Sequence, residues 1–244
     1  MRPTLTLTLT LAALALIGCG KPEETASGST TNPKTQLATS IADVEVKPGD
    51  EASLLPIKQG ARWTFATEEA VAGPGGQARG NSDVIFEMSK VEPWGGGQKV
   101  TIEMMTGGKV SNRQIWGINK EGIFQLATGL KLNALTPPQP ICRFPVKTGD
   151  KYTWTGKGTI GDNVADMTTQ YEVKGNRIVD TEQGQTKALM IESATVLKSK
   201  GTVGESRLAV WIRPGSGVVR LSEVTKFGNI LRSAKLRLKS TSGL

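Results

Sequence analysis

Residues 55–65 read Leu-Pro-Ile-Lys-Gln-Gly-Ala-Arg-Trp-Thr-Phe, and residues 144–154 read Phe-Pro-Val-Lys-Thr-Gly-Asp-Lys-Tyr-Thr-Trp. The two segments align without a gap, and the proline, lysine, glycine and threonine are identical in both. Gly60 and Gly149 precede the aromatic run of each segment. Because glycine adopts positive φ at little cost, we expect a turn at each glycine and a strand after it.

A second pair of matching segments follows in the same order. Ile115-Trp116 and residues 122–126 correspond to Val210-Trp211 and residues 217–221, with six positions from tryptophan to glycine in both. Two ordered matches at similar spacing predict a duplicated unit of about 90 residues. The predicted repeats are residues 53–141 and residues 142–244.

Between these blocks, apolar and polar residues alternate with a period of two. In the run 82–91 the apolar members of the alternation are Val84, Phe86 and Met88. The same alternation occurs in the runs 100–104, 169–173, 186–198, 207–212, 218–227 and 234–239. This pattern, interrupted by glycine-rich turns, is typical of half-buried antiparallel strands. We therefore predict an all-β chain of about ten strands whose curved sheet forms a half-barrel, a barrel or two packed layers.

The segment Thr136-Pro137-Pro138-Gln139-Pro140 is the natural junction between the two predicted repeats. Proline cannot donate to a sheet ladder, so strands are expected to stop there. We predict no amphipathic helix after residue 52, apart from a short turn near Leu130–Leu135.

The first residues are typical of an export signal. A basic Arg2 precedes the apolar run 5–17, which is too short to span a bilayer and has the length of a signal-peptide core. The segment 16–19, Leu-Ile-Gly-Cys, resembles a lipobox, which implies cleavage after residue 18 and lipidation of Cys19. An ordinary secretory signal with an incidental cysteine is the alternative.

Residues 19–52 are predicted to be a lipidated cysteine followed by a flexible tether, because the stretch is rich in threonine, serine, proline and glycine. Acylation would hold the protein at a membrane of the cell envelope. By resemblance to lipoprotein sorting in enteric bacteria, Gly20 implies the outer membrane, facing the periplasm.

The chain contains no histidine. This excludes histidine-activated serine or cysteine nucleophiles and histidine-ligated metals. Asp162, Asn163 and Asp166 offer oxygen ligands but lack the loop of a calcium site. We therefore expect no enzymatic activity, catalytic residue, metal or cofactor. After lipidation of Cys19, Cys142 has no disulfide partner and is expected to be a half-buried apolar residue.

The net charge of +8 lies entirely in the second half, since residues 1–142 carry 13 basic and 13 acidic side chains and residues 143–244 carry 17 and 9. This excess favours solubility or contact with an anionic surface. Nucleic acid is not expected as a partner, because the chain is exported and has no recognition motif.

Aromatic residues at repeated positions are predicted to pack in the core, with ligand stacking as the alternative. These positions are Trp63 and Tyr152, Phe65 and Trp154, and Trp116 and Trp211. Trp94 lies in a predicted glycine-rich hairpin tip, where it either contacts a membrane or partner or folds back on its own hairpin.

The repeated block and the later Trp…Gly-Val-Val-Arg-Leu segment resemble uncharacterised secreted bacterial proteins that open with a Pro-Leu-x-x-Gly-x-x-Trp-x-Tyr strand. Such proteins are similar in outline to lipoproteins of the LolA and LppX type, which implies an open half-barrel that holds lipid. Two functions remain open at this point. One is a structural or protein-binding platform of the cell envelope, which the clean alternation favours. The other is a carrier of a lipid or other apolar ligand.

Overall fold

The computed structural model describes residues 51–160 and 163–244. The short helix α1 (Glu51–Leu54) lies across the boundary predicted at residues 52 and 53, and twelve strands follow in the described residues. The strands are β1 (Arg62–Gly73), β2 (Gly76–Trp94), β3 (Gly97–Thr106), β4 (Lys109–Asn119), β5 (Gly122–Thr128), β6 (Asn133–Arg143), β7 (Lys151–Ile160), β8 (Asn163–Thr181), β9 (Gly184–Ser199), β10 (Thr202–Arg213), β11 (Gly217–Phe227) and β12 (Ile230–Ser242). The predicted signal peptide, Cys19, nearly all of the tether, and Asp162 lie outside the described residues.

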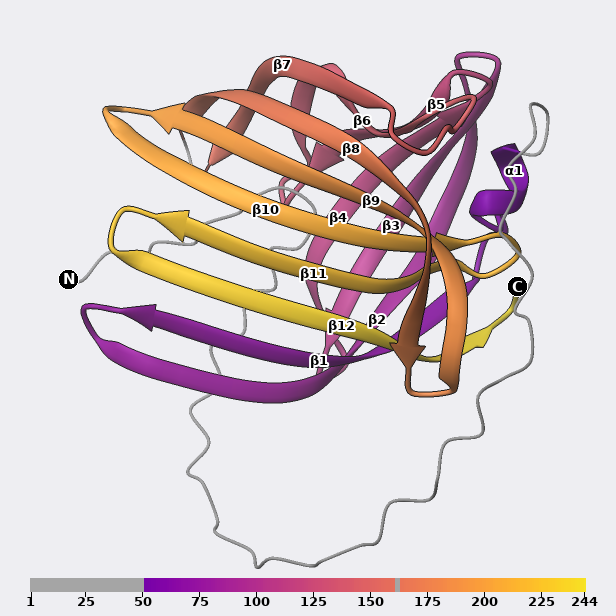
Figure 1. Cartoon of the computed structure of the whole chain (residues 1–244), viewed down its shortest axis with the longest axis horizontal. Helices are drawn as coiled ribbons and strands as arrows, with labels where there is room; N and C mark the ends of the chain where they lie inside the picture. Colours follow the sequence, from indigo (N-terminus) through magenta and orange to yellow (C-terminus); the bar gives the residue numbers. More distant parts are fainter. Residues whose placement is uncertain (1–50, 161–162) are drawn as a thin grey trace, which may run out of the picture.

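Each strand pairs antiparallel with its neighbours in the chain, and β1 pairs with β12 to close the barrel (Figure 1). The all-β prediction is confirmed. Of the three predicted shapes, a half-barrel, a barrel or two packed layers, the sheet forms the barrel. Closure removes the two free edges that a half-barrel would expose.

The prediction that strands stop at the prolines is wrong. Strand β6 continues through Pro137, Pro138 and Pro140, and the Thr136–Pro137 peptide bond is cis. The prolines instead reduce the pairing between β6 and β7, which share the single register pair Thr136 and Lys157. Proline lacks an N–H donor, so the β6–β7 seam has the fewest register pairs of the described sheet.

Apolar side chains make up most of the barrel interior. Two of the alternating runs found in the sequence are now β2 and β12. Their inward residues Val84, Met88 and Leu236 are fully buried. Such side chains contribute about 1.5–3 kcal/mol each when removed from water. The core holds together without a disulfide in the described part, where Cys142 is a free, buried thiol.

The two glycine turns have the same hydrogen bonds. Gly60 N–H donates to the Met88 carbonyl at 2.8 Å, as Gly149 N–H donates to the Val173 carbonyl at 2.8 Å. Gly60 and Gly149 have φ of 84° and 90°, which is the conformation expected from the sequence. Each turn therefore holds the start of one strand against the next strand of the chain. The first turn holds β1 against β2, and the second holds β7 against β8.

Candidate functional site

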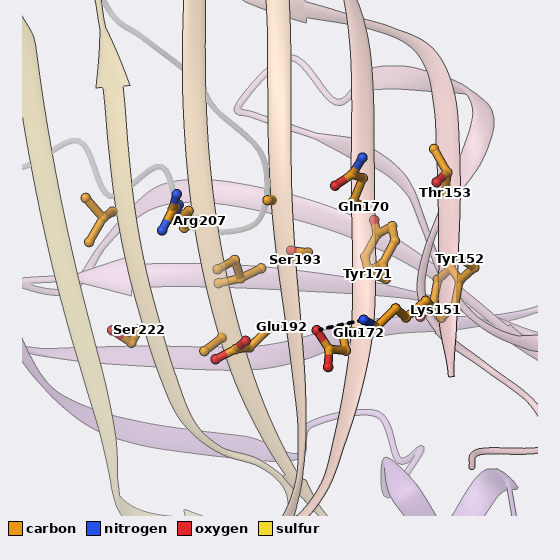
Figure 2. A pocket seen from close by; sticks show the side chains of 14 residues that line it. Lys151, Tyr152, Thr153, Gln170, Tyr171, Glu172, Glu192, Ser193, Arg207 and Ser222 are labelled. Carbon is orange, nitrogen blue, oxygen red and sulfur yellow. Dashed lines mark ion pairs between the residues drawn. The ribbon is translucent and has the colours of Figure 1, made fainter. Parts of the chain in front are cut away.

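A groove of about 660 Å³ crosses strands β7 to β11 (Figure 2). Its lining follows two register rows that run across all five strands. The first row is Lys151, Glu172, Glu192, Ala209 and Ser222. The second row is Thr153, Gln170, Ala194, Arg207 and Val224. These residues are exposed or half-buried, so the groove lies on the outer side of the sheet.

Residues of opposite parity lie between these rows and direct their side chains toward the barrel interior, and an aromatic pair dominates them. The rings of Tyr152 and Tyr171 stack with their centroids 4.7 Å apart, and the Arg143 guanidinium lies 4.9 Å from the Tyr152 ring centroid. Burial raises the pKa of both phenols, so both stay neutral at physiological pH. The Tyr171 hydroxyl accepts a hydrogen bond from Gln139 at 2.8 Å. This pair makes a rigid wall rather than a reactive one.

One edge of the groove is a chain of charges. Glu172 and Glu192 stand opposite each other in the β8–β9 register, an arrangement that is unfavourable for like charges. Lys174 lies between them, 2.9 Å from Glu172 and 3.3 Å from Glu192. Lys151 approaches Glu172 from β7 at 3.9 Å, as Figure 2 shows. The hydrogen bond from Lys174 lowers the pKa of Glu172, so this carboxyl group stays ionised.

A second set of polar side chains forms a ladder inside the barrel. Thr169 Oγ1 lies 3.2 Å from the Gln139 amide, which donates to it, and 2.9 Å from Thr195 Oγ1. On β10 and β11, the hydroxyls of Ser206 and Thr225 each donate to the Glu223 carboxylate at 3.1 Å. Beside this ladder is a cavity of about 20 Å³, large enough for a single water molecule.

The groove offers anchoring groups but no acid–base pair. Carboxylates that divide acid and base roles need pKa values that their surroundings push apart. Glu172 is held ionised by Lys174, and the carboxyl group with a raised pKa, Glu223, lies in the interior. Within the described ranges, no three His, Cys, Asp or Glu side chains gather to hold a metal ion.

The repeated aromatic positions divide between core and surface. The four buried members are Trp63, Phe65, Trp116 and Trp154. Tyr152 and Trp211 are half-buried, and Trp211 packs under the Arg220 guanidinium at 5.2 Å. All six positions therefore pack in or against the core, and Tyr152 also borders the groove.

Trp94 folds back as one alternative predicted, but onto strands beyond its own hairpin. Its ring lies 6.2 Å from the Phe124 ring centroid on β5 and covers Gly117 on β4. Gly117 has no side chain, which leaves room for the indole.

Two further residues considered in the sequence analysis, Cys142 and Asp166, lie away from the groove. Cys142 is fully buried, more than the half-burial expected, and burial raises the pKa of its thiol to about 12. Asp166 is exposed and lies 3.7 Å from Lys157. Neither residue belongs to the groove.

The sequence did not identify the groove or the inner polar ladder. Their members are separated by ten to thirty positions and meet only through strand register. A signal did exist for part of the ladder: Thr169, Thr195 and Thr225 occupy inward positions in runs whose other inward members are apolar.

No protein-family model and no curated protein matches the chain. Among solved structures, a protein described as exported with a YmcC-like fold, from Bacteroides fragilis, is 12% identical, with a TM-score of 0.43 over 75% of this chain and 97% of that one. A chain described as a lipoprotein, from Parabacteroides distasonis, is 15% identical, with a TM-score of 0.42 over 76% of this chain and 98% of that one. The hypothetical lipoprotein YmcC of Escherichia coli is 12% identical, with a TM-score of 0.38 over 78% of this chain and 95% of that one. These scores are too low for the likeness to support an argument about function.

Across residues 51–160 and 163–244, no helix is long and apolar enough to cross a bilayer.

Proposed function

We propose that this protein is a lipid-anchored, non-enzymatic platform of the cell envelope that binds another protein in the groove on β7–β11. The observation that carries the proposal is the contrast between the two sides of the sheet. The interior is filled and keeps a cavity of about 20 Å³ beside Tyr171, whereas the outer side carries a groove of about 660 Å³. Binding capacity therefore resides on the outside of the barrel.

The chemistry of the groove suits a polypeptide ligand. Arg207 is of a residue type enriched at the energetic centres of protein interfaces. Val224 is 45% exposed and adds an apolar contact. The charged edge around Lys174 would fix the orientation of a partner more than its affinity. Because the five strands are hydrogen-bonded to one another, the partner meets a preformed surface.

The alternative is the lipid or apolar-ligand carrier. Small-molecule sites usually enclose about 300–1,000 Å³ and are mostly apolar. The inner cavity beside Gln139 is much smaller than this. The groove falls within this range of volume, but its lining mixes charged side chains such as Glu172 and Arg207 with apolar ones such as Val224. We therefore keep the carrier as an outcome of the test below.

We also propose that the barrel arose by duplication of a six-strand unit, β1–β6 and β7–β12. Its support is the equivalent geometry of the two glycine turns at Gly60 and Gly149. A further correspondence supports it, because the ladder beside Trp116 and the ladder beside Trp211 each contain a register shift.

The platform is tested by photo-crosslinking in intact envelopes. A photoreactive phenylalanine analogue at Val224 is expected to capture one protein, and the analogue at Ile178, exposed on β8 outside the groove, is not. Ala194→Arg fills the groove and should abolish capture. The matched control, Ala134→Arg, changes an exposed alanine on β6 and should preserve it.

Native mass spectrometry of the same full-length preparations distinguishes the alternative. A stoichiometric lipid that is lost in Ala194→Arg, with no protein captured at Val224, would replace the platform with the carrier. Equal capture at Val224 and Ile178 would rule out the groove as the binding site.

A further inference from the structure

Three neighbouring hairpins turn at the same end of the barrel, away from α1. Hairpins β9–β10, β11–β12 and β1–β2 are consecutive because β10 pairs with β11 and β12 pairs with β1. Their turns lie together on the left of Figure 1, and α1 lies on the right. The outer faces of these hairpins carry a surface that does not overlap the groove.

Large apolar side chains are exposed on these hairpins. Val196 is 42% exposed, Val203 is 52% exposed and Leu231 is 47% exposed. They alternate with lysines across the register: Lys198 pairs with Val203, and Lys226 pairs with Leu231. We call the six residues Val196, Lys198, Lys200, Val203, Lys226 and Leu231 the tip surface.

In the described part of the chain, the cations of the tip surface form no ion pair, although Asp166 stands opposite Lys198 and Glu205 stands opposite Lys226 in the strand register. Lys198, Lys200 and Lys226 are exposed and form no ion pair within the described residues. Glu205 is the sole carboxylate in residues 70–79, 196–205 and 226–231, all of which are described. Arg79 on β2 adds a further exposed cation.

Elsewhere on the same barrel, cations lie beside carboxylates. Arg237 contacts Glu68 and Glu182, and Lys239 contacts Asp83 at 2.8 Å. At these pairs the opposite charges compensate each other, whereas the three lysines of the tip surface are not compensated by an ion pair among the described residues.

We propose that the tip surface docks onto an anionic phospholipid bilayer. Val203 and Leu231 enter the interface, while Lys198, Lys200 and Lys226 contact lipid phosphates. Apolar side chains surrounded by lysines match the apolar–anionic layering of such a surface, and a basic side chain near an anionic leaflet adds favourable energy. A bilayer offers a continuous apolar layer for the valine and leucine side chains directly beneath its phosphates, so we favour lipid.

Chain length permits this orientation together with an N-terminal anchor. Strand β12 has 13 residues and is about 43 Å long at ~3.3 Å per residue. The stretch 20–50 could extend to about 100 Å, more than the length of the barrel. An anchor at Cys19 would raise the local concentration of the tip surface at the membrane, but the proposal does not depend on it.

An environment-sensitive dye tests the proposal on the full-length protein. The dye is attached to Val203→Cys or Leu231→Cys. Ile178→Cys is the control at a distant exposed site, and the parent protein without an introduced cysteine gives the background signal. Cys142 is fully buried and does not compete for label, and the parent protein measures any label taken up at Cys19. The vesicles contain either phosphatidylglycerol with phosphatidylethanolamine, or phosphatidylcholine alone.

We expect a blue shift at positions 203 and 231 with the anionic vesicles alone, no shift at position 178, and loss of the shift in high salt. Replacing Lys198, Lys200 and Lys226 by glutamine should weaken docking about a hundredfold, since each lysine contributes roughly fivefold. The same change at Lys58, Lys120 and Lys147, exposed near the other end, should have little effect.

Equal shifts at positions 178 and 203, or equal shifts on the two vesicle types, would overturn the proposal. So would a dye that responds to an acidic protein and to neither vesicle.

Discussion

At the scale of the residue, Glu223 is the side chain whose titration should be visible in stability. Burial raises its pKa from 4.5 to about 7, although Arg232 and two hydroxyl donors act in the opposite direction. The folded chain therefore keeps a proton that the unfolded chain loses between these values. The contribution of Glu223 to stability is therefore fully present below pH 4.5 and should fall by about 3 kcal/mol as the pH rises to 7. Because the chain has no histidine, few other groups titrate in this interval. Urea unfolding of Glu223→Gln should show a much flatter pH dependence; an unchanged slope would assign it to another group.

At the scale of the element, the β6–β7 seam is the sparsest part of the ladder. Gly156 on β7 makes a close approach possible, because a Cβ there would meet the Trp154 ring and lie 2.8 Å from the Thr136 carbonyl oxygen. Gly156→Ala should lower the free energy of unfolding by about 2 kcal/mol and speed amide exchange in β6 and β7. Gly80→Ala on β2, where a Cβ meets nothing within 4 Å, is the matched control. Similar losses in both variants would mean that the seam is not specially constrained.

At the scale of the whole molecule, attachment to the membrane and closure of the barrel are separable. Cys19 lies in the stretch that precedes the barrel, and β1 pairs with β12 without it. Cys19→Ala should therefore fold normally but lose its lipid and its firm membrane association, because a single cysteine carries the predicted anchor. Fractionation with a salt wash, which removes electrostatic docking by the tip surface, measures the loss. A variant that stays in the washed membrane pellet would contradict the lipobox interpretation.

Period-two alternation predicted strands such as β2 and β12 with the correct inward face. Val84 and Leu236 are inward because side chains alternate strictly along a strand, and this follows from local order alone. The positive φ of Gly60 and Gly149 was predictable for the same reason. The expected number of about ten strands is slightly below the twelve of the described residues.

The sequence by itself determined the all-β class, the inward faces and the two glycine turns, since each depends on neighbours along the chain. Tertiary structure alone decided the closure by β1 and β12, the passage of β6 through its prolines, and the assembly of the groove. Lys151, Glu172 and Arg207 meet only because five strands adopt one register, and a shift of one residue would turn every side chain of a strand to the other face. Register is set by packing across the whole barrel, and the alternation of residues within one strand does not reveal it.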